Sequence, residues 1–158
     1  PFPHPAPGTS VGLALFDVEG DGDLDWLSQG GLGSPTPASD MEPRLLLNDA
    51  AGALARDPGA FTPLGDPAQG RVTLVADFDA DQRPDVFVGY DDAPGSSRDT
   101  RNRLFFNEGG SFSVGRVGAA SDLTRAGSVA DFDGDGDPDL FVANRTTPDF
   151  LLRNVTIK

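Results

Sequence analysis

A nine-residue acidic segment occurs three times in this 158-residue chain, and the recurrence constrains the fold more than any other feature. The copies align without gaps at residues 17–25, 77–85 and 131–139. Their spacing is longer than that of the common helical repeats and suits a four-stranded unit of roughly 50 residues. The sequence therefore predicts a single domain of three repeats, with approximate bounds 1–55, 56–109 and 110–158.

Short apolar runs flank every acidic segment, and they are too short and too rich in β-branched and aromatic residues for helices. Three runs recur in each repeat, and we expect them to form strands: 11–15, 24–27 and 44–48, then 72–75, 86–88 and 103–107, then 127–129, 140–142 and 150–154. A weaker fourth strand is expected before a unit, at 61–64 and 112–114. The proline-rich residues 1–7 fit either the first copy of this strand or a frayed terminus. The pattern predicts an all-β protein.

The acidic segments carry the composition of calcium loops. Carboxylates on alternate residues repel one another unless a cation neutralises them, and glycines allow the chain to wrap around that cation. Ca²⁺ takes six to eight oxygen ligands, whereas Mg²⁺ needs a stricter octahedron and is the second choice. Solvated acidic turns are the plain alternative, which recurrence in register disfavours. The loops are not EF-hands, because position 12 holds Ser28, Val88 and Val142 where that motif needs Glu.

We expect side-chain ligation from positions 1, 3, 5 and 9 of each loop and a backbone carbonyl from position 7, giving three Ca²⁺ sites. The candidate metal residues are Asp17, Glu19, Asp21, Asp23 and Asp25, then Asp77, Asp79, Asp81, Arg83 and Asp85, then Asp131, Asp133, Asp135, Asp137 and Asp139. The second site is expected to be the weakest, because Ala80, Gln82 and Arg83 replace residues that favour the loop. A positive φ at Ala80 would cost strain.

At these residues the sequence resembles the FG-GAP/VCBS repeat family, the blades of integrin-α-like β-propellers. The three loops look like that family's D-x-D-x-D-G-x-x-D calcium loop, and residues 130–144 are an especially close match. Residues 102–107 are similar to the third strand of such a blade. The resemblance implies calcium-stabilised, extracellular, non-catalytic scaffolding used in adhesion or ligand recognition.

Two features depart from the family pattern. Glu19 replaces Asp at position 3 of the first loop, and the chain supplies three blades of about four antiparallel strands where propellers close with four to eight. An incomplete or open propeller follows, completed by oligomerisation or by missing chain. The chain is thus expected to be a fragment of a longer propeller, part of a closed ring of copies, or a filament subunit.

The charge balance supports this interpretation. The chain has 25 acidic and 12 basic residues, and the three loops contain 14 of the acidic ones, so the rest of the chain is close to neutral. The net charge of −13 disfavours a nucleic acid or an anionic membrane as partner. No apolar run is long enough for a membrane span. The chain begins at Pro1, which indicates a processed protein or a piece of a longer one.

The sequence thus predicts an extracellular or cell-surface calcium-binding module that forms homo-oligomers or filaments through edge strands and its terminal segments, 1–7 and 155–158. The alternative is a lectin-like or ligand-recognition propeller fragment with a glycan or protein ligand. Enzyme activity is not expected, because cysteine is absent, His4 is the single histidine, and the carboxylates recur instead of forming one site. The sequons at Asn144 and Asn154 are candidate glycosylation sites.

Overall fold

The computed structural model describes residues 10–30, 43–57, 59–61, 68–92, 97–119 and 122–155. Within these ranges all regular structure is β, in three antiparallel sheets that are not closed into a barrel, and the predicted all-β class is confirmed. The described residues contain no helix long and apolar enough to cross a membrane. Residues 1–9 and 156–158, to which part of the self-association hypothesis refers, lie outside the described chain.

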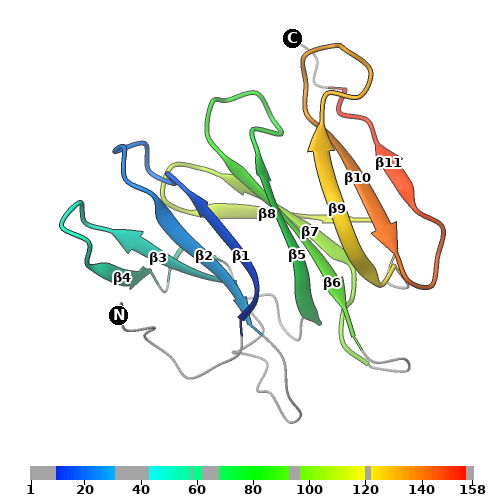
Figure 1. Ribbon diagram of the computed structural model, residues 1–158, viewed down its shortest axis with the longest axis horizontal. Helices are drawn as coiled ribbons and strands as arrows, with labels where there is room; N and C mark the ends of the chain where they lie inside the picture. The colour runs from blue at the N-terminus through cyan, green and yellow to red at the C-terminus, as the bar shows by residue number, and fades with distance from the viewer. Residues whose placement is uncertain are drawn as a thin grey trace.

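Each sheet is built from strands that follow one another in sequence, and we call the sheets blades 1, 2 and 3. Blade 1 has the order β1 (Ser10–Phe16), β2 (Asp25–Gly30), β3 (Pro43–Asn48) and β4 (Leu54–Asp57). Blade 2 has the order β5 (Gln69–Ala76), β6 (Asp85–Asp91), β7 (Asn102–Asn107) and β8 (Phe112–Val117). Blade 3 has the order β9 (Thr124–Ala130), β10 (Asp139–Asn144) and β11 (Phe150–Leu152). Figure 1 shows the blades fanned side by side, with blades 1 and 3 at opposite ends.

The repeat in sequence is also a repeat in strand register. In every blade the pairing of the first two strands shifts by one residue near the end remote from the acidic loop: between Ser10 and Gly12, between Gly70 and Val72, and between Ala143 and Asn144. A bulge at a fixed place keeps the alternation of side chains the same in the three blades. Equivalent sequence positions therefore lie on equivalent faces.

The fourth strand differs from the prediction. Residues 112–117 form β8, which pairs with β7 and so completes blade 2 instead of opening the third repeat. The physical reason is a tight connection: the Glu108 amide donates to the Ser111 carbonyl at 2.8 Å, and Gly109 and Gly110 supply positive φ angles. In blade 1 the corresponding strand is β4, while Phe61 makes only an isolated bridge to Phe112 and residues 62–64 lie outside the described chain.

Alternate side chains of each blade face the preceding or the following blade, and we call these the back and front faces. Leu27 and Phe87 occupy equivalent front-face positions and are fully buried. Blade 2 covers Leu27, and blade 3 covers Phe87. The back face of blade 2 contributes Val86, Val88 and Tyr90 to the first of these two interblade cores. Apolar burial between faces is the main stabilising contact of the fan.

Ion pairs join blades 2 and 3 at the end of β6 opposite its acidic loop. The buried carboxylate of Asp91 lies 3.1 Å from the Arg125 guanidinium and 3.2 Å from that of Arg145, both in or beside blade 3. Arg71 of β5 lies 3.6 Å from the same carboxylate. Several cations around one buried anion compensate its desolvation.

Truncating a phenylalanine on the front face should destabilise the fold by an amount that depends on whether another blade covers it. Phe87→Ala should lower the free energy of unfolding by about 3–5 kcal/mol, because it empties the core between blades 2 and 3. Phe141→Ala, at the equivalent position of blade 3 where the ring is 45 % exposed, should cost less than about 1 kcal/mol in the monomer. Denaturant unfolding of the two variants measures the difference, and equal costs would contradict the assignment of faces.

Candidate metal centre

Each acidic loop connects the first two strands of its blade, at one end of the fan. Position 1 directly follows β1, β5 or β9, and position 9 is the first residue of β2, β6 or β10. Position 9 pairs with the last residue of the preceding strand, as Asp85 does with Ala76. The strand pairing of the hairpin therefore brings the two ends of each nine-residue loop together without the help of a cation.

The position 1 aspartate folds the loop around its own carboxylate. Its oxygens accept hydrogen bonds from backbone amides three to five residues later, at 2.7–3.1 Å. Asp17 accepts from Gly20, Asp21 and Gly22, Asp77 from Asp81 and Gln82, and Asp131 from Gly134 and Gly136. These bonds satisfy amides that have no strand partner and turn the loop back on itself.

The position 9 aspartate is the buried member of each loop. Asp25, Asp85 and Asp139 are each at most 1 % exposed. One carboxylate oxygen accepts from the position 2 amide and the other from the amide of an asparagine at the end of the third strand, or just beyond it, all at 2.8–2.9 Å. A carboxylate has about four lone-pair sites, so two bonds leave capacity for a cation.

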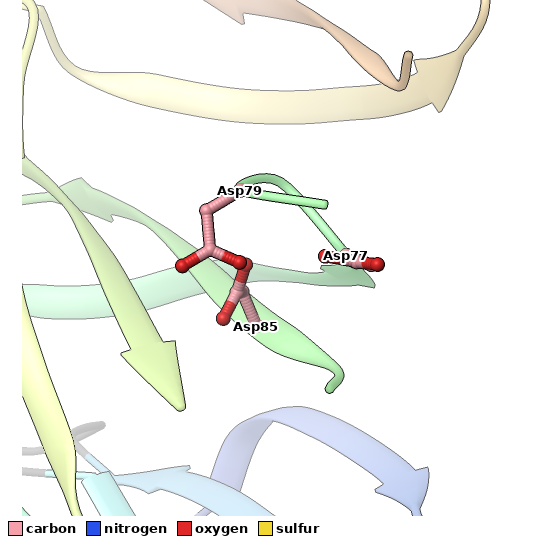
Figure 2. A group of neighbouring side chains, drawn as sticks. All are labelled: Asp77, Asp79 and Asp85. Carbon is pink, nitrogen blue, oxygen red and sulfur yellow. The ribbon is translucent and has the colours of Figure 1, made fainter. Parts of the chain in front are cut away.

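Positions 1, 3 and 9 converge in the second and third loops. Carboxylate oxygens of Asp77, Asp79 and Asp85 lie within 4.8 Å of one another, and those of Asp131, Asp133 and Asp139 do the same. Figure 2 shows the carboxylates of Asp79 and Asp85 approaching each other, with Asp79 on the loop that follows Asp77. Ligand oxygens bound at 2.3–2.6 Å to one Ca²⁺ are separated by no more than about twice that distance, so both groups fit this ion.

Positions 5 and 7 lie outside these two groups. The carboxylates of Asp21, Asp81 and Asp135 each accept a hydrogen bond from the position 7 amide at 2.8–3.0 Å, which closes a short turn. The side chain of Arg83 forms an ion pair with Asp81 and donates to the Asn107 carbonyl. Asp23 and Asp137 occupy position 7 of the other loops, and Asp137 is buried.

The first loop lacks such a group within the described chain. Its position 3 residue, Glu19, is exposed, and desolvation followed by the charges of Asp25 and Asp21 raises its pKa. The geometry therefore makes the first loop, rather than the second, the least prepared for a cation. Position 3 is Glu19 in this loop and the shorter aspartate in the other two, and this sequence difference accompanies the lack of a convergent group.

The protein's own cations already neutralise part of the loop charge. Arg153, next to the end of blade 3, forms an ion pair with Asp133, and Arg83 pairs with Asp81. Arg153 contacts a carboxylate of the third convergent group, so a metal there competes with the guanidinium for Asp133. Arg83 instead engages a carboxylate outside the second group and leaves its three members available.

Two carboxylates of the second loop, those of Asp85 and Asp79, have raised pKa values, chiefly because they are desolvated. Burial raises the pKa of Asp85 to about 6, although hydrogen bonds from the Asn107 and Phe78 amides oppose the shift. Desolvation and the charge of Asp81 raise the pKa of Asp79. A cation bound to these two carboxylates would offset their desolvation.

Three asparagines, Asn48, Asn107 and Asn154, were not among the predicted metal residues, and Asn154 was predicted only as a candidate glycosylation site. Their backbone amides hold the position 9 carboxylates, and two of their side chains bridge neighbouring blades. The amide of Asn107 donates to the Val18 carbonyl at 2.9 Å, and that of Asn154 donates to the Phe78 carbonyl at 2.7 Å. Their recurrence at the same place in each repeat was the signal that could have found them.

The two candidate glycosylation residues are both engaged by their side-chain amides. Asn144 donates to the Pro148 carbonyl at 3.1 Å and lies at the end of β10. Asn154 makes the interblade bond to Phe78. Thr156, the third residue of the second sequon, lies outside the described chain.

Comparison with known proteins bears on the repeat that was identified in the sequence. The family model for the FG-GAP-like repeat matches residues 77–142, from the second acidic loop to the middle of β10. The resemblance found in the sequence is therefore confirmed over a stretch that contains both convergent groups. A comparison with curated proteins finds no match.

Backbone strain in the second loop generates one prediction. Ala80 and Gln82 have φ angles of 63° and 71°, where the first and third loops place glycines at 78–96°. A Cβ at Gly134 would meet nothing within 4 Å, so only the backbone conformation decides the cost there. In chelator, Ala80→Gly should raise the free energy of unfolding by about 1 kcal/mol, and Gly134→Ala should lower it by a similar amount. A loss of stability in the Ala80→Gly variant would overturn the strain argument.

A second prediction concerns pH. In chelator, Asp85 binds its proton more tightly in the folded chain than in the unfolded chain, where its pKa is near 3.8. Its contribution therefore favours folding at low pH and is lost as the pH rises from about 4 to about 6. Calcium competes with that proton, so affinity at the second loop should fall as the pH is lowered through about 6. Calorimetric titration at several pH values measures this, and a second-loop affinity that stays constant between about pH 5 and about pH 7 would contradict it.

Proposed function

We propose that this protein is a calcium-stabilised module of propeller-like blades that works outside the cell in adhesion or ligand recognition. The observation that carries the proposal is the convergence of three carboxylates in each of the second and third loops. The three members are the first residue after one strand, a residue within the connecting loop and the first residue of the next strand. A cation held there fixes the hairpin that begins each blade.

The role of calcium in this proposal is structural. Three carboxylates within 4.8 Å repel one another, and a divalent cation converts that repulsion into attraction. The position 9 aspartate also holds the asparagine that bridges to the preceding blade. Calcium at a loop should therefore stiffen both the hairpin and the contact between blades.

The extracellular setting and the lack of catalysis belong to the same proposal. Calcium sites of extracellular modules work at about 10⁻⁴–10⁻³ M, and loops whose position 3 carboxylates are exposed to solvent suit that range. The recurrence of one carboxylate pattern favours metal ligation over an active site. The near-neutral charge outside the loops suits a chain that associates with its own copies.

Calorimetric titration with calcium tests the metal assignment. The chain should bind two calcium ions, one at each convergent group. Asp79→Asn should remove one of them and Asp133→Asn the other, because each substitution deletes an exposed position 3 ligand without emptying a core. Calcium should also raise the melting temperature, and that gain should shrink in each variant.

The matched control is Glu19→Gln, which changes position 3 of the loop that lacks a convergent group. It should leave both binding events unchanged. Calcium binding that survives in the Asp79→Asn, Asp133→Asn double variant would contradict the assignment. A change in stoichiometry with Glu19→Gln alone would place a site in the first loop.

A further inference from the structure

The two outer faces of the fan are exposed copies of surfaces that are covered inside it. The front faces of blades 1 and 2 each pack against the back face of the next blade. The front face of blade 3 and the back face of blade 1 have no such neighbour in the described chain. Figure 1 places these two blades at opposite ends, with blade 2 between them.

The front face of blade 3 carries the apolar residues that its counterparts bury. Position 2 of the acidic loop is Val18 in blade 1 and Phe78 in blade 2, at 2 % and 8 % exposure, but Phe132 in blade 3 is 72 % exposed. Phe141 is 45 % exposed where Leu27 and Phe87 are fully buried. Phe132 and Phe141 line a hollow of about 220 Å³ together with Leu151.

The back face of blade 1 is apolar in a matching way. Leu13, Leu15 and Leu24 are each more than half exposed. Leu15 and Leu24 line a second hollow with Trp26, of about 270 Å³. Most of the large exposed apolar side chains of the described residues lie on these two faces. Contiguous exposed apolar surface of this kind marks an interaction site.

The side chain of Asn48 indicates which surface the back face of blade 1 would contact. Asn107 and Asn154 each reach across to the position 2 carbonyl of the preceding blade. Asn48, the equivalent residue of blade 1, borders the second hollow and turns instead to the Leu24 carbonyl of its own loop, at 3.3 Å. Its Nδ2 is the group that would donate to a position 2 carbonyl of another blade, as Nδ2 of Asn107 and Asn154 does. The position 2 carbonyl of the third loop belongs to Phe132, on the exposed front face.

We propose that the front face of blade 3 docks on the back face of blade 1 of a second copy, with Asn48 of that copy at the Phe132 carbonyl. The contact repeats the front-to-back packing that the chain already uses twice, and this deepens the self-association in the proposed function. Because the two faces differ, the contact is head-to-tail and closes a ring or extends a chain of copies. Sheet faces, rather than edge strands, carry the association.

Two single-face variants test the proposal by analytical ultracentrifugation in calcium. Phe141→Asp places a charge on the front face and Leu15→Asp places one on the back face, both at exposed positions that leave the monomer folded. The wild-type chain should associate, and each variant should associate about tenfold or more weakly. Mixing the two variants should give a 1:1 complex, because one intact face of each kind is then available.

Val114→Asp is the matched control, because Val114 is 42 % exposed on the edge strand β8 and belongs to neither outer face. It should associate like the wild type. A variant mixture that forms no complex, or association lost in Val114→Asp alone, would overturn the proposed contact. A wild-type chain that stays monomeric would also overturn it. Calcium stoichiometry measured on the same samples decides separately whether the metal assignment stands.

Discussion

The rest of the structure depends on the hydrogen bonds accepted by the buried aspartate at position 9 of each acidic loop. Its two oxygens tie the start of the loop to the end of the third strand, so one side chain fixes a hairpin and a third strand together. In blades 2 and 3 the asparagine held in this way also reaches the loop of the preceding blade. A continuous line of hydrogen bonds therefore runs from Asp139 through Asn154 and Phe78 to Asp85.

This arrangement couples the metal chemistry to the packing of the fan. The carboxylate that would hold a cation also holds the group that bridges two blades. Burial raises the pKa of Asp85 to about 6, so near neutral pH its charge is maintained against desolvation in the absence of a metal. In the proposed function, a bound calcium ion would relieve this electrostatic cost and so stabilise the contact between the blades.

Some of the architecture and the loop chemistry could be predicted from the sequence, and the failures have local causes. The acidic segments and their flanking apolar runs predicted the first three strands of each blade, because hydrophobic periodicity and loop spacing are local signals. The fourth strand was misplaced, since residues 112–117 read equally well as the start of one repeat or the end of another. The tight Glu108–Ser111 connection decided between them by pairing β8 with β7.

The sequence by itself determined that this is a repetitive β protein whose excess negative charge is concentrated in three loops. It also indicated strain at Ala80, because an alanine stands where glycine occupies a left-handed conformation. Only the tertiary structure decided which carboxylates meet, since Glu19 and Asp79 occupy the same loop position but only Asp79 joins a convergent group. It alone decided that Phe87 is buried and Phe141 is not, because burial at equivalent positions depends on whether another blade lies against them.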